Sequence, residues 1–498
     1  MRKTKMFTKL LSVFLVLILV ACSTKENEVQ ETILAKVGDK TISVNEFIRR
    51  SEYTVRPSWC KNDNYIHRKI VLNSLIAEKL VAAEVEETEK ILTNPEIKLY
   101  LDGRREQAMR QLHFNETATK KVILDSLELQ KAYQNAERTY KVSILPLNEE
   151  LAYKIKNDLS QGKTSFDDLQ EEFEAATQQE NKEQEFSFNT PIDDELFKAL
   201  YLENVSDNQV LGPLKIENNS YVLMRVNGWT RSLVMGDKAR QTEIDVKEIV
   251  TQIRARDSYS LWLKNLMSGK KIEFNPAVFE ELVNLIGPDY FKSKEDKREA
   301  FNKRFWNKDN GEMYLDDIQG RMEKILDQPL LTLDGEVWTV RQFEEELKSH
   351  PLVFRNRKMP KKEFGAQFRL AVADLIRDQF ITEDAYEKGY DKHPLVKRDE
   401  NMWRDNILSL YQRKKIVEGA KSNKASGHSF VKNNLDPYIA DLRKKYQDDV
   451  KINTDVFEKI ELTSVDMFVI QRNMPFPVIV PQFPQLTTHN KLDYGKKM

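Results

Sequence analysis

The sequence predicts a helix-rich α+β protein with more than one domain. Only 16 of its 498 residues are glycine, less than half of the usual share of about 7%, which argues against a turn-dense all-β chain. Charged residues make up 32% and hydrophobic residues 40%, a balance that indicates solvated helices around real cores rather than a disordered chain. The length corresponds to two or more domains at roughly 100–200 residues each. The formal net charge of -1 excludes a strongly basic nucleic-acid binder.

The N-terminus predicts export and a lipid anchor. A basic start precedes an apolar run at 10–20 that is too short to span a membrane comfortably, as in a secretory signal. Leu19-Val20-Ala21-Cys22 resembles a bacterial lipobox, in which Cys22 is acylated and becomes the first mature residue. We expect a signal peptide at 1–21 and a polar tether at 22–32, with an uncleaved anchor helix as the alternative. Both place the body outside the cytoplasm on a membrane, most simply facing the periplasm.

The second cysteine, Cys60, has no partner for an intramolecular disulfide once Cys22 is acylated. We expect a structural thiol there, with a reactive thiol as the alternative.

Three sequence patterns occur twice in the same order. Residues 36–47 and 333–343 both contain two short β-branched pieces around a Gly/Asp turn, followed by a Ser or Thr that can cap a helix. An apolar helical stripe follows each of them, and a third pattern ends in Phe-Asn-Pro-Ala-Val-Phe at 274–279 and Ile-Asn-Thr-Asp-Val-Phe at 452–457. The order predicts two copies of one helical module, at about 33–285 and 330–463.

The first copy is interrupted by a segment of different character. Residues 140–229 contain an alternating strand, two amphipathic helices and two closing strands. This pattern predicts a compact α+β domain inserted in the helical module. The expected domains are 33–137 with 232–285 as the first module, the insert at 138–231, a helical linker at 286–329, the second module at 330–463 and a Pro/aromatic-rich tail at 464–498.

This order of parts resembles the SurA-type parvulin foldases, a class that includes PrsA and PpiD. The resemblance rests on the lipobox, on the Val-Gly-Asp-x-x-Ile-x-Val-x-Glu-Phe opening at 37–47 and on the insert. Within the insert, Gly162 and Phe166-Asp167-Asp168-Leu169 are similar to the parvulin helix motif, and Gly212-Pro213 to its turn. The resemblance implies a duplicated SurA-N-like helical chaperone module carrying a parvulin-like peptidyl-prolyl isomerase domain.

The insert departs from the family at the positions that support catalysis. Ser143 and Val222 stand where parvulins usually have histidine, and Phe197 and Tyr221 are the remaining aromatic candidates for a proline pocket. Isomerisation must lower a barrier of about 18–20 kcal/mol. Without both histidines we expect a degenerate domain that binds without efficient turnover, with an active isomerase as the alternative.

A chaperone needs exposed apolar surface with a charged rim. The candidate client-binding residues are those on the matched helices: Leu75, Leu80, Val81, Leu375, Phe380 and Ile381. The same stripes also serve a core, so burial is the alternative. The proline-rich segment 474–484 cannot be helical and is expected to be a strap over its own domain or a mimic of a client.

Other functional classes have less support. The six histidines lack metal-ligand spacing, and no phosphate-binding glycine loop or nucleophile motif occurs. We therefore expect no cofactor and no metal. The expected partners are unfolded secreted or outer-membrane polypeptides and the lipid bilayer through Cys22, with no nucleic acid. A passive scaffold lipoprotein of an envelope complex is a further alternative.

Overall fold

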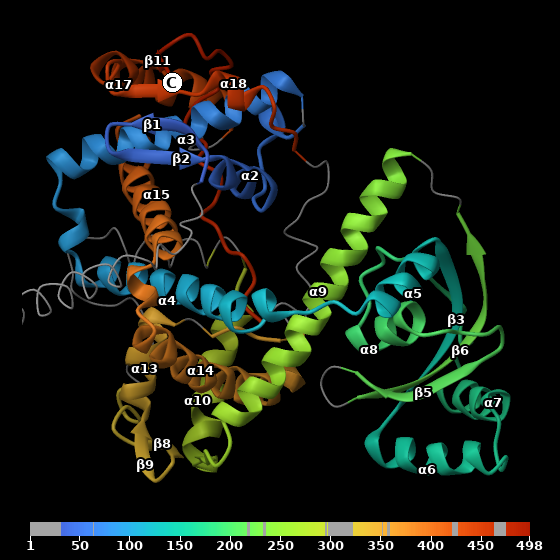
Figure 1. Ribbon diagram of the computed structural model, residues 1–498. Coiled ribbons are helices and arrows are strands. Elements are labelled where there is room, and N and C mark those ends of the chain that lie inside the picture. The colour runs from blue at the N-terminus through green and yellow to red at the C-terminus, as the bar shows by residue number, and fades with distance from the viewer. Residues whose placement is uncertain are drawn as a thin grey trace, which may run out of the picture. The chain divides into compact units, whose positions relative to one another are not determined.

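The protein is a helix-rich α+β chain, as the sequence predicts, and its described residues form three small sheets (Figure 1). The computed structural model describes residues 31–62, 64–216, 220–232, 236–293, 296, 322–350, 352–355, 359–420, 427–462 and 475–498. The predicted signal peptide, Cys22 and most of the tether and of the linker lie outside these residues. The chain forms two compact units. Unit 1 comprises residues up to Glu89 together with 405–466 and 480–498, and unit 2 comprises 90–404 and 467–479.

Unit 1 is built on a sheet with the order β11-β10-β1-β2. The hairpin of β1 (Ile33–Val37) and β2 (Lys40–Ser43) turns at Gly38, whose φ of +60° suits glycine. The Ser43 hydroxyl then accepts the Glu46 N–H at 3.1 Å and starts α2 (Val44–Glu52). Both ends of the described chain contribute, since β10 (Val450–Ile452) pairs with β1, and β11 (Lys496–Lys497) pairs with β10 (Figure 1).

The helices of unit 1 surround the long helix α3 (Tyr65–Thr88), whose central turns are buried on all sides. Its buried turns are mainly apolar, and they also contain Glu78 and Lys79, whose charges are paired inside the unit. The other members of unit 1 are η1 (Ser58–Cys60), the part of α15 (Pro394–Gly419) from Asp405 onward, α16 (His428–Phe430), η8 (Val431–Leu435), α17 (Asp436–Lys445) and α18 (Thr454–Phe457).

Unit 2 contains a sheet with the order β7-β8-β9. The hairpin of β8 (Pro329–Leu333) and β9 (Glu336–Thr339) is followed by α13 (Val340–Ser349), which begins with a capping box between Thr339 and Gln342. The core beneath this sheet includes Phe279, Phe343 and Phe368. The other helical elements around it are η2 (Ile91–Thr93), α4 (Pro95–Thr117), η3 (Thr119–Lys121), α10 (Pro276–Tyr290), η6 (Lys361–Glu363), α14 (Phe364–Glu387), η7 (Tyr390–Lys392) and the first part of α15.

The two sheets group the chain differently from the predicted consecutive modules. The strand β7 (Ile272–Phe274), expected in the first module, pairs with β8 of the second, and β10, expected in the second, pairs with β1 of the first. The helices follow the same rule, because α4 lies with α13 and α14 in unit 2, while the end of α15 lies with α3 in unit 1. Sequence order alone does not show which hairpin a distant strand will join.

The insert forms its own antiparallel sheet with the order β4-β3-β6-β5. Its ends are adjacent, because Arg138 on β3 pairs with Arg231 on β6 and the Ser232 N–H donates to the Glu137 carbonyl at 2.9 Å. The insert comprises β3 (Arg138–Leu147), α6 (Glu149–Ser160), α7 (Phe166–Thr177), β4 (Gln184–Phe186), α8 (Asp194–Phe197), η4 (Lys198–Leu202), β5 (Val210–Lys215) and β6 (Tyr221–Arg231).

The core of the insert extends beyond the predicted limits 138–231. One face of its sheet packs against Ala132 of α5 (Ser126–Ala136) and against Val246, Val250 and Ile253 of α9 (Asp237–Leu266). The other face is covered by α6 and α7. Further along α9, Tyr259 and Trp262 belong to a different apolar cluster. The helix α9 therefore serves both the insert and the helical part of unit 2.

The described part of the tail, 475–498, is extended up to its last residues and packs against the chain, as expected for a strap. In unit 2, Phe476 is buried beside Phe114 and Tyr259. In unit 1, Phe483 and Leu486 are buried.

Candidate functional site

The four predicted pocket residues of the insert do not converge. Ser143 pairs with Arg225 across β3 and β6, and its hydroxyl accepts a hydrogen bond from the Asn227 amide at 2.9 Å. Val222 pairs with Pro146 and lies on the opposite face of the sheet. The reason is the two-residue period of a strand, which separates side chains at odd and even pairing positions. Ser143 and Val222 therefore cannot line one pocket.

The two aromatic candidates are also separated. Phe197 is buried in the same core as Val222, with its ring centroid 4.9 Å from that of Tyr201. Tyr221 lies on the other face, and its hydroxyl is 3.4 Å from a Glu149 carboxylate oxygen. An isomerase needs an accessible apolar slot for proline, whereas Phe197 and Val222 are covered by neighbouring side chains.

The insert does build the two motif segments on which the resemblance rests. Helix α7 begins at Ser165 with a capping box to Asp168, and Phe166 is buried with an Arg225 guanidinium over its ring at 4.6 Å. Gly212 has a φ of +108°, and a Cβ there would approach the Leu214 nitrogen to 2.7 Å. Only glycine fits this position of β5.

The candidate client-binding residues lie in cores rather than on a surface. Five of the six are buried: Leu75, Leu80, Val81, Leu375 and Ile381. Phe380 is partly buried, with the Lys270 ammonium 3.9 Å from its ring centroid. The physical reason is that α3 and α14 are central helices, so their apolar side chains pack inside the folded protein. These residues are not available to hold a client in this structure.

Exposed apolar side chains occur instead beside α5 and α9. Ile123 is 94% exposed, Leu127 68% and Leu261 66%. Ile123 lies on a linker beside α9. The preceding residue, Val122, packs against the same apolar cluster as Trp262 of α9. Glu128 of α5, next to Leu127, pairs with Arg254 of α9. Leu261 lies two turns further along the same side of α9. We name Ile123, Leu127 and Leu261 the α5–α9 apolar surface.

Sequence reasoning missed this surface, although one signal was present. Ser-Leu-Trp-Leu at 260–263 places three consecutive apolar residues on a helix. Consecutive side chains point in different directions around a helix, so all three cannot face a core on one side of it. Leu261 is the one left outside.

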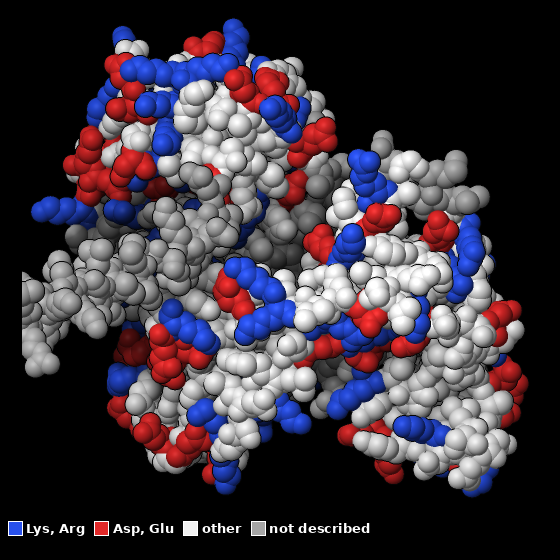
Figure 2. Space-filling view, in the orientation of Figure 1, with Lys and Arg blue, Asp and Glu red and all other residues white. Residues whose placement is uncertain are grey.

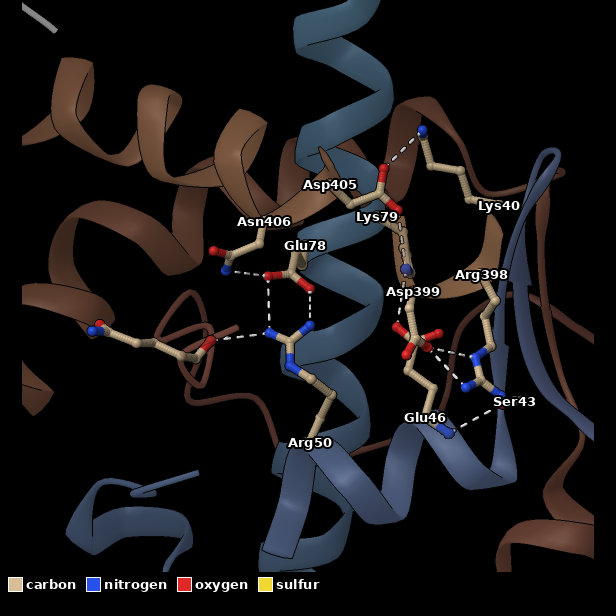
Figure 3. A network of polar contacts seen from close by, with 11 residues as sticks. Lys40, Ser43, Glu46, Arg50, Glu78, Lys79, Arg398, Asp399, Asp405 and Asn406 are labelled. Atoms are coloured by element: carbon tan, nitrogen blue, oxygen red, sulfur yellow. Dashed lines mark hydrogen bonds and ion pairs between the residues drawn. The ribbon is translucent and has the colours of Figure 1, made fainter. Parts of the chain in front are cut away.

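Unit 1 contains a buried ionic network that the sequence did not reveal (Figure 3). Arg50 of α2 donates two hydrogen bonds to Glu78 of α3, at 2.8 and 3.0 Å, and both side chains are 0% exposed. The Asn406 amide of α15 donates to Glu78 at 2.8 Å, and Arg50 also donates to the Gln482 carbonyl of the tail at 3.0 Å. The network thus joins four segments that are distant in sequence.

A second part of the network surrounds Lys79 (Figure 3). Its ammonium lies 3.0 Å from carboxylate oxygens of both Glu46 and Asp405, and Asp405 also accepts from Lys40 at 2.9 Å. Burial opposes the charge of Lys79, but the carboxylates of Glu46 and Asp405 outweigh it and raise the pKa of Lys79. Burial raises the pKa of Glu46 against the pull of Lys79 and Arg50. The carboxylates and cations are paired with each other, which indicates a structural rather than a catalytic network.

Unit 2 contains a buried histidine cluster. His113 of α4 lies 2.6 Å from a carboxylate oxygen of Asp384 and 3.0 Å from the Tyr259 hydroxyl. Burial lowers the pKa of His113, and the hydrogen bond to Asp384 offsets this only in part. A neutral imidazole that donates to Asp384 and accepts from Tyr259 satisfies all three groups. The Thr117 hydroxyl lies 3.4 Å from the same His113 nitrogen that faces Asp384. A catalytic triad needs the nucleophile and the carboxylate on opposite ring nitrogens, so this cluster is not a triad.

The structure gives no sign of a reactive thiol at Cys60. The side chain is fully buried, and burial raises the pKa of the thiol to about 12, against a smaller opposing effect of Arg56. A thiol in such surroundings is inert at neutral pH.

The described residues contain no group of His, Cys, Asp and Glu side chains that could hold a metal ion. None of the described helices is long and apolar enough to cross a membrane. Positive and negative side chains are interspersed over the face seen in Figure 2, which favours solubility over one dominant electrostatic field. Comparisons with protein-family models, with curated proteins and with solved structures found no match for this chain.

Proposed function

We propose that the protein is a lipid-anchored extracytoplasmic chaperone that holds unfolded secreted or outer-membrane chains. The observation that carries this proposal is the architecture around the insert. An α+β body with its own sheet is entered and left through paired strands, Arg138 opposite Arg231. It interrupts helical segments that twice carry the same hairpin and helix. A helical holder with an isomerase-like domain is what the resemblance to SurA-type parvulin foldases implies.

The matched patterns support a duplicated module. The Asn453 N–H donates to the Leu34 carbonyl at 2.9 Å, and the Asn275 N–H donates to the Leu330 carbonyl at 2.9 Å. In both cases the third strand beside a hairpin lies just before the Asn of the third pattern, Phe-Asn-Pro-Ala-Val-Phe at 274–279 and Ile-Asn-Thr-Asp-Val-Phe at 452–457. We infer that two copies of one module exchange their third strands.

The insert is proposed as a parvulin-like domain that has lost efficient catalysis. Gly162 and Phe166 support the likeness, since Gly162 has a φ of +64° and Phe166 is buried at the start of α7. The separation of Ser143 from Val222 supports the loss. The proposed role of this domain is packing or client contact.

The α5–α9 apolar surface is the proposed client contact. Ile123, Leu127 and Leu261 present apolar side chains to solvent, and the Glu128–Arg254 ion pair supplies charge beside them. Such a surface can hold many sequences because apolar contact is non-directional.

The test is suppression of aggregation. An unfolded outer-membrane protein diluted from denaturant should scatter less light in the presence of the full chain in mild detergent. Replacing Ile123, Leu127 and Leu261 by serine should raise the concentration needed for half suppression at least five-fold.

The matched control replaces three other exposed apolar residues by serine: Val55, Ile66 and Val353. This variant should hold clients as well as the unaltered chain. Equal loss in both variants would refute the proposed client surface, and no suppression by the unaltered chain would refute the chaperone and leave a scaffold lipoprotein.

Separately, Cys22→Ala should release the protein from membranes, and a variant that stays bound after signal cleavage would contradict the lipid anchor.

A further inference from the structure

The sheets of the two units differ at one outer edge. In unit 1 the strand β10 has β1 on one side and β11, from the C-terminal tail, on the other. In unit 2 the corresponding strand β7 has β8 on one side and, among the residues that the structure describes, no strand on the other.

The hydrogen bonds establish which residues correspond. The Gly38 N–H donates to the Asp449 carbonyl at 3.1 Å, and the Asp334 N–H donates to the Lys271 carbonyl at 3.0 Å. The Asn453 N–H and the Asn275 N–H likewise donate to equivalent carbonyls, those of Leu34 and Leu330. Val450 of β10 therefore corresponds to Ile272 of β7, and Ile452 corresponds to Phe274. The backbone therefore has the same phase in both strands.

This pattern leaves two residues in each third strand whose backbone N–H and C=O groups point away from the hairpin, toward the outer edge of the sheet. In an antiparallel pair, residues alternate between those bonded to the partner and those whose N–H and C=O point away. Since Lys271 and Asn275 bond to β8, Ile272 and Phe274 point their backbone groups to the outer edge. At the same position in unit 1, the outward carbonyl of Ile452 accepts the Met498 N–H at 3.1 Å.

Covering the edge also changes burial. Val450 and Ile452 are almost fully buried, whereas Ile272 and Phe274 are only partly buried. The exposed face beside β7 and β8 is hollowed, with a volume of about 400 Å³ lined by residues that include Lys271, Glu273 and Thr332. Side chains of an added strand would have room there.

We propose that the outer edge of β7 binds an extended segment of a client polypeptide as an added strand. Unpaired strand edges bind peptides in this way through their backbone groups. The chain itself supplies the precedent, because its own tail occupies the same edge of the matching sheet. The choice of a client as ligand rests on the proposed chaperone function, whereas the binding edge does not.

The preferred segment alternates apolar and polar residues and is not lysine-rich. One face of an added strand meets the apolar side chains of Ile272 and Phe274, and the other meets the polar hollow. In unit 1 the tail lysines 496 and 497 pair with Asp448 and Asp455. The corresponding residues of unit 2 are 270 and 277, a lysine and an alanine. Alternating strands of outer-membrane barrels have the required pattern.

Hydrogen exchange of the full chain gives the direct test. The probe is a twelve-residue peptide of alternating valine and threonine with two glutamates. Saturation with this peptide should slow exchange of the Ile272 and Phe274 amides at least ten-fold. The Glu273 amide, already directed to β8, should change little. Binding without this alternating protection would overturn the proposal.

A matched pair of variants tests the same edge. Ile272→Pro removes an outward N–H without removing a bond to β8, and should weaken peptide binding at least ten-fold in fluorescence anisotropy. Val337→Pro removes an outward N–H from β9, on the opposite edge of the sheet, and should leave binding unchanged. A peptide with alternate N-methylated residues should not bind, and equal binding of this peptide would contradict strand pairing.

The outcome separates the two proposals. Suppression of aggregation without protection of β7 would refute the added strand and retain the chaperone. Protection of β7 without suppression of aggregation would retain the peptide site and refute the chaperone.

Discussion

The two units both bury an acidic side chain on a central helix, but they neutralise it differently. In unit 1, Glu78 of α3 forms a fully buried ion pair with one described cation, Arg50, and accepts a further hydrogen bond from the Asn406 amide. In unit 2, Asp378 of α14 lies 3.1 Å from His350 and 2.6 Å from Arg377, with Arg110 at 3.9 Å. Neutralisation of Glu78 therefore depends on one described cation. Asp378 has several cationic neighbours, so it should tolerate the loss of one of them.

The units also differ in how much of the tail they use. The Asn73 amide of unit 1 donates to the carbonyls of His489 and Lys491, both at 2.9 Å, and Arg50 donates to that of Gln482. In unit 2 the described part of the tail contributes the short segment around Phe476. Unit 1 is thus completed by the last residues of the chain, and unit 2 is complete before them.

Ending the chain after Ile479 should have the largest effect. Phe483 and Leu486 would no longer be buried, at about 1.5–3 kcal/mol each. Asn73 and Arg50 would lose buried partners, at about 1–3 kcal/mol each. The sum is comparable with the whole stability of a domain, about 5–15 kcal/mol, so unit 1 should unfold.

Hydrogen exchange would show this as lost protection in α3 with retained protection in α14. Replacing Lys496 and Lys497 by serine serves as the control, because both are exposed and should cost little. Equal loss of protection in the two helices would mean that the units do not differ in their dependence on the tail.

Arg50→Ala should have the next largest effect. It leaves the Glu78 carboxylate buried without its cation, which costs about 3–5 kcal/mol. His350→Ala leaves Asp378 with Arg377 and Arg110 and should cost about 1–2 kcal/mol, as expected for loss of one buried hydrogen bond. Denaturant unfolding of both variants measures the difference.

A double variant sharpens the comparison. Arg50→Met with Glu78→Leu removes both charges and should recover most of the loss, since well-packed apolar residues can replace a buried ion pair. If Arg50→Ala and His350→Ala cost the same, the number of partners is not what sets tolerance.

The units should also respond oppositely to mild acid. Burial lowers the pKa of His113 in unit 2, so the unfolded chain takes up the proton first as the pH falls below about 6.5. Stability is then lost by up to about 1.4 kcal/mol per pH unit until the folded pKa is reached. Burial raises the pKa of Glu46 in unit 1. The stability linked to a neutral Glu46 is present at low pH and is lost as the pH rises through the raised pKa.

His113→Gln and Glu46→Gln isolate these contributions. The difference in unfolding free energy between the unaltered chain and His113→Gln should change between pH 7 and pH 5, with the unaltered chain losing more. For Glu46→Gln the sign should be opposite, with the unaltered chain gaining stability relative to the variant as the pH falls toward the ordinary glutamate pKa of about 4.5. A flat difference for His113→Gln would show that the imidazole is protonated equally in both states.

The sequence was a good guide to local structure and a poor guide to long-range grouping. The Ser43 and Thr339 caps, the Gly38 turn and the strands of the insert follow from short patterns, because their causes lie within a few residues. The pairing of β7 with β8 does not, since the similar hairpins β1–β2 and β8–β9 offer equivalent partners. The register of β3 was equally hidden, because a one-residue change in phase moves Ser143 to the other face.

The burial of five of the six candidate client-binding residues, the alternative that the sequence left open, has a related cause. An apolar stripe on a helix has the same appearance whether it faces a core or a client, and α3 and α14 proved to be central. Exposure at Ile123 and Leu261 depends on how α5 and α9 pack, which no local pattern contains. The Arg50–Glu78 pair was likewise invisible, since charged residues in sequence are most often solvated.

The smallest effect concerns Cys60, which can report on unit 1 without destabilising it. In a Cys22→Ala variant Cys60 is the only cysteine. Its side chain is fully buried at the end of η1, which packs against α3, and burial raises the pKa of the thiol to about 12. Because the thiolate is the reactive form, a thiol reagent at pH 8 should label the native chain very slowly and the denatured chain at once.

The labelling rate then follows opening of unit 1. Arg50→Ala should accelerate labelling of Cys60, since it weakens the packing of α2 against α3, whereas His350→Ala in unit 2 should leave the rate unchanged. Both variants carry Cys22→Ala, so that a single thiol is counted. Rapid labelling of the native chain would show that Cys60 is accessible, and equal acceleration by both variants would show that the two units open together rather than separately.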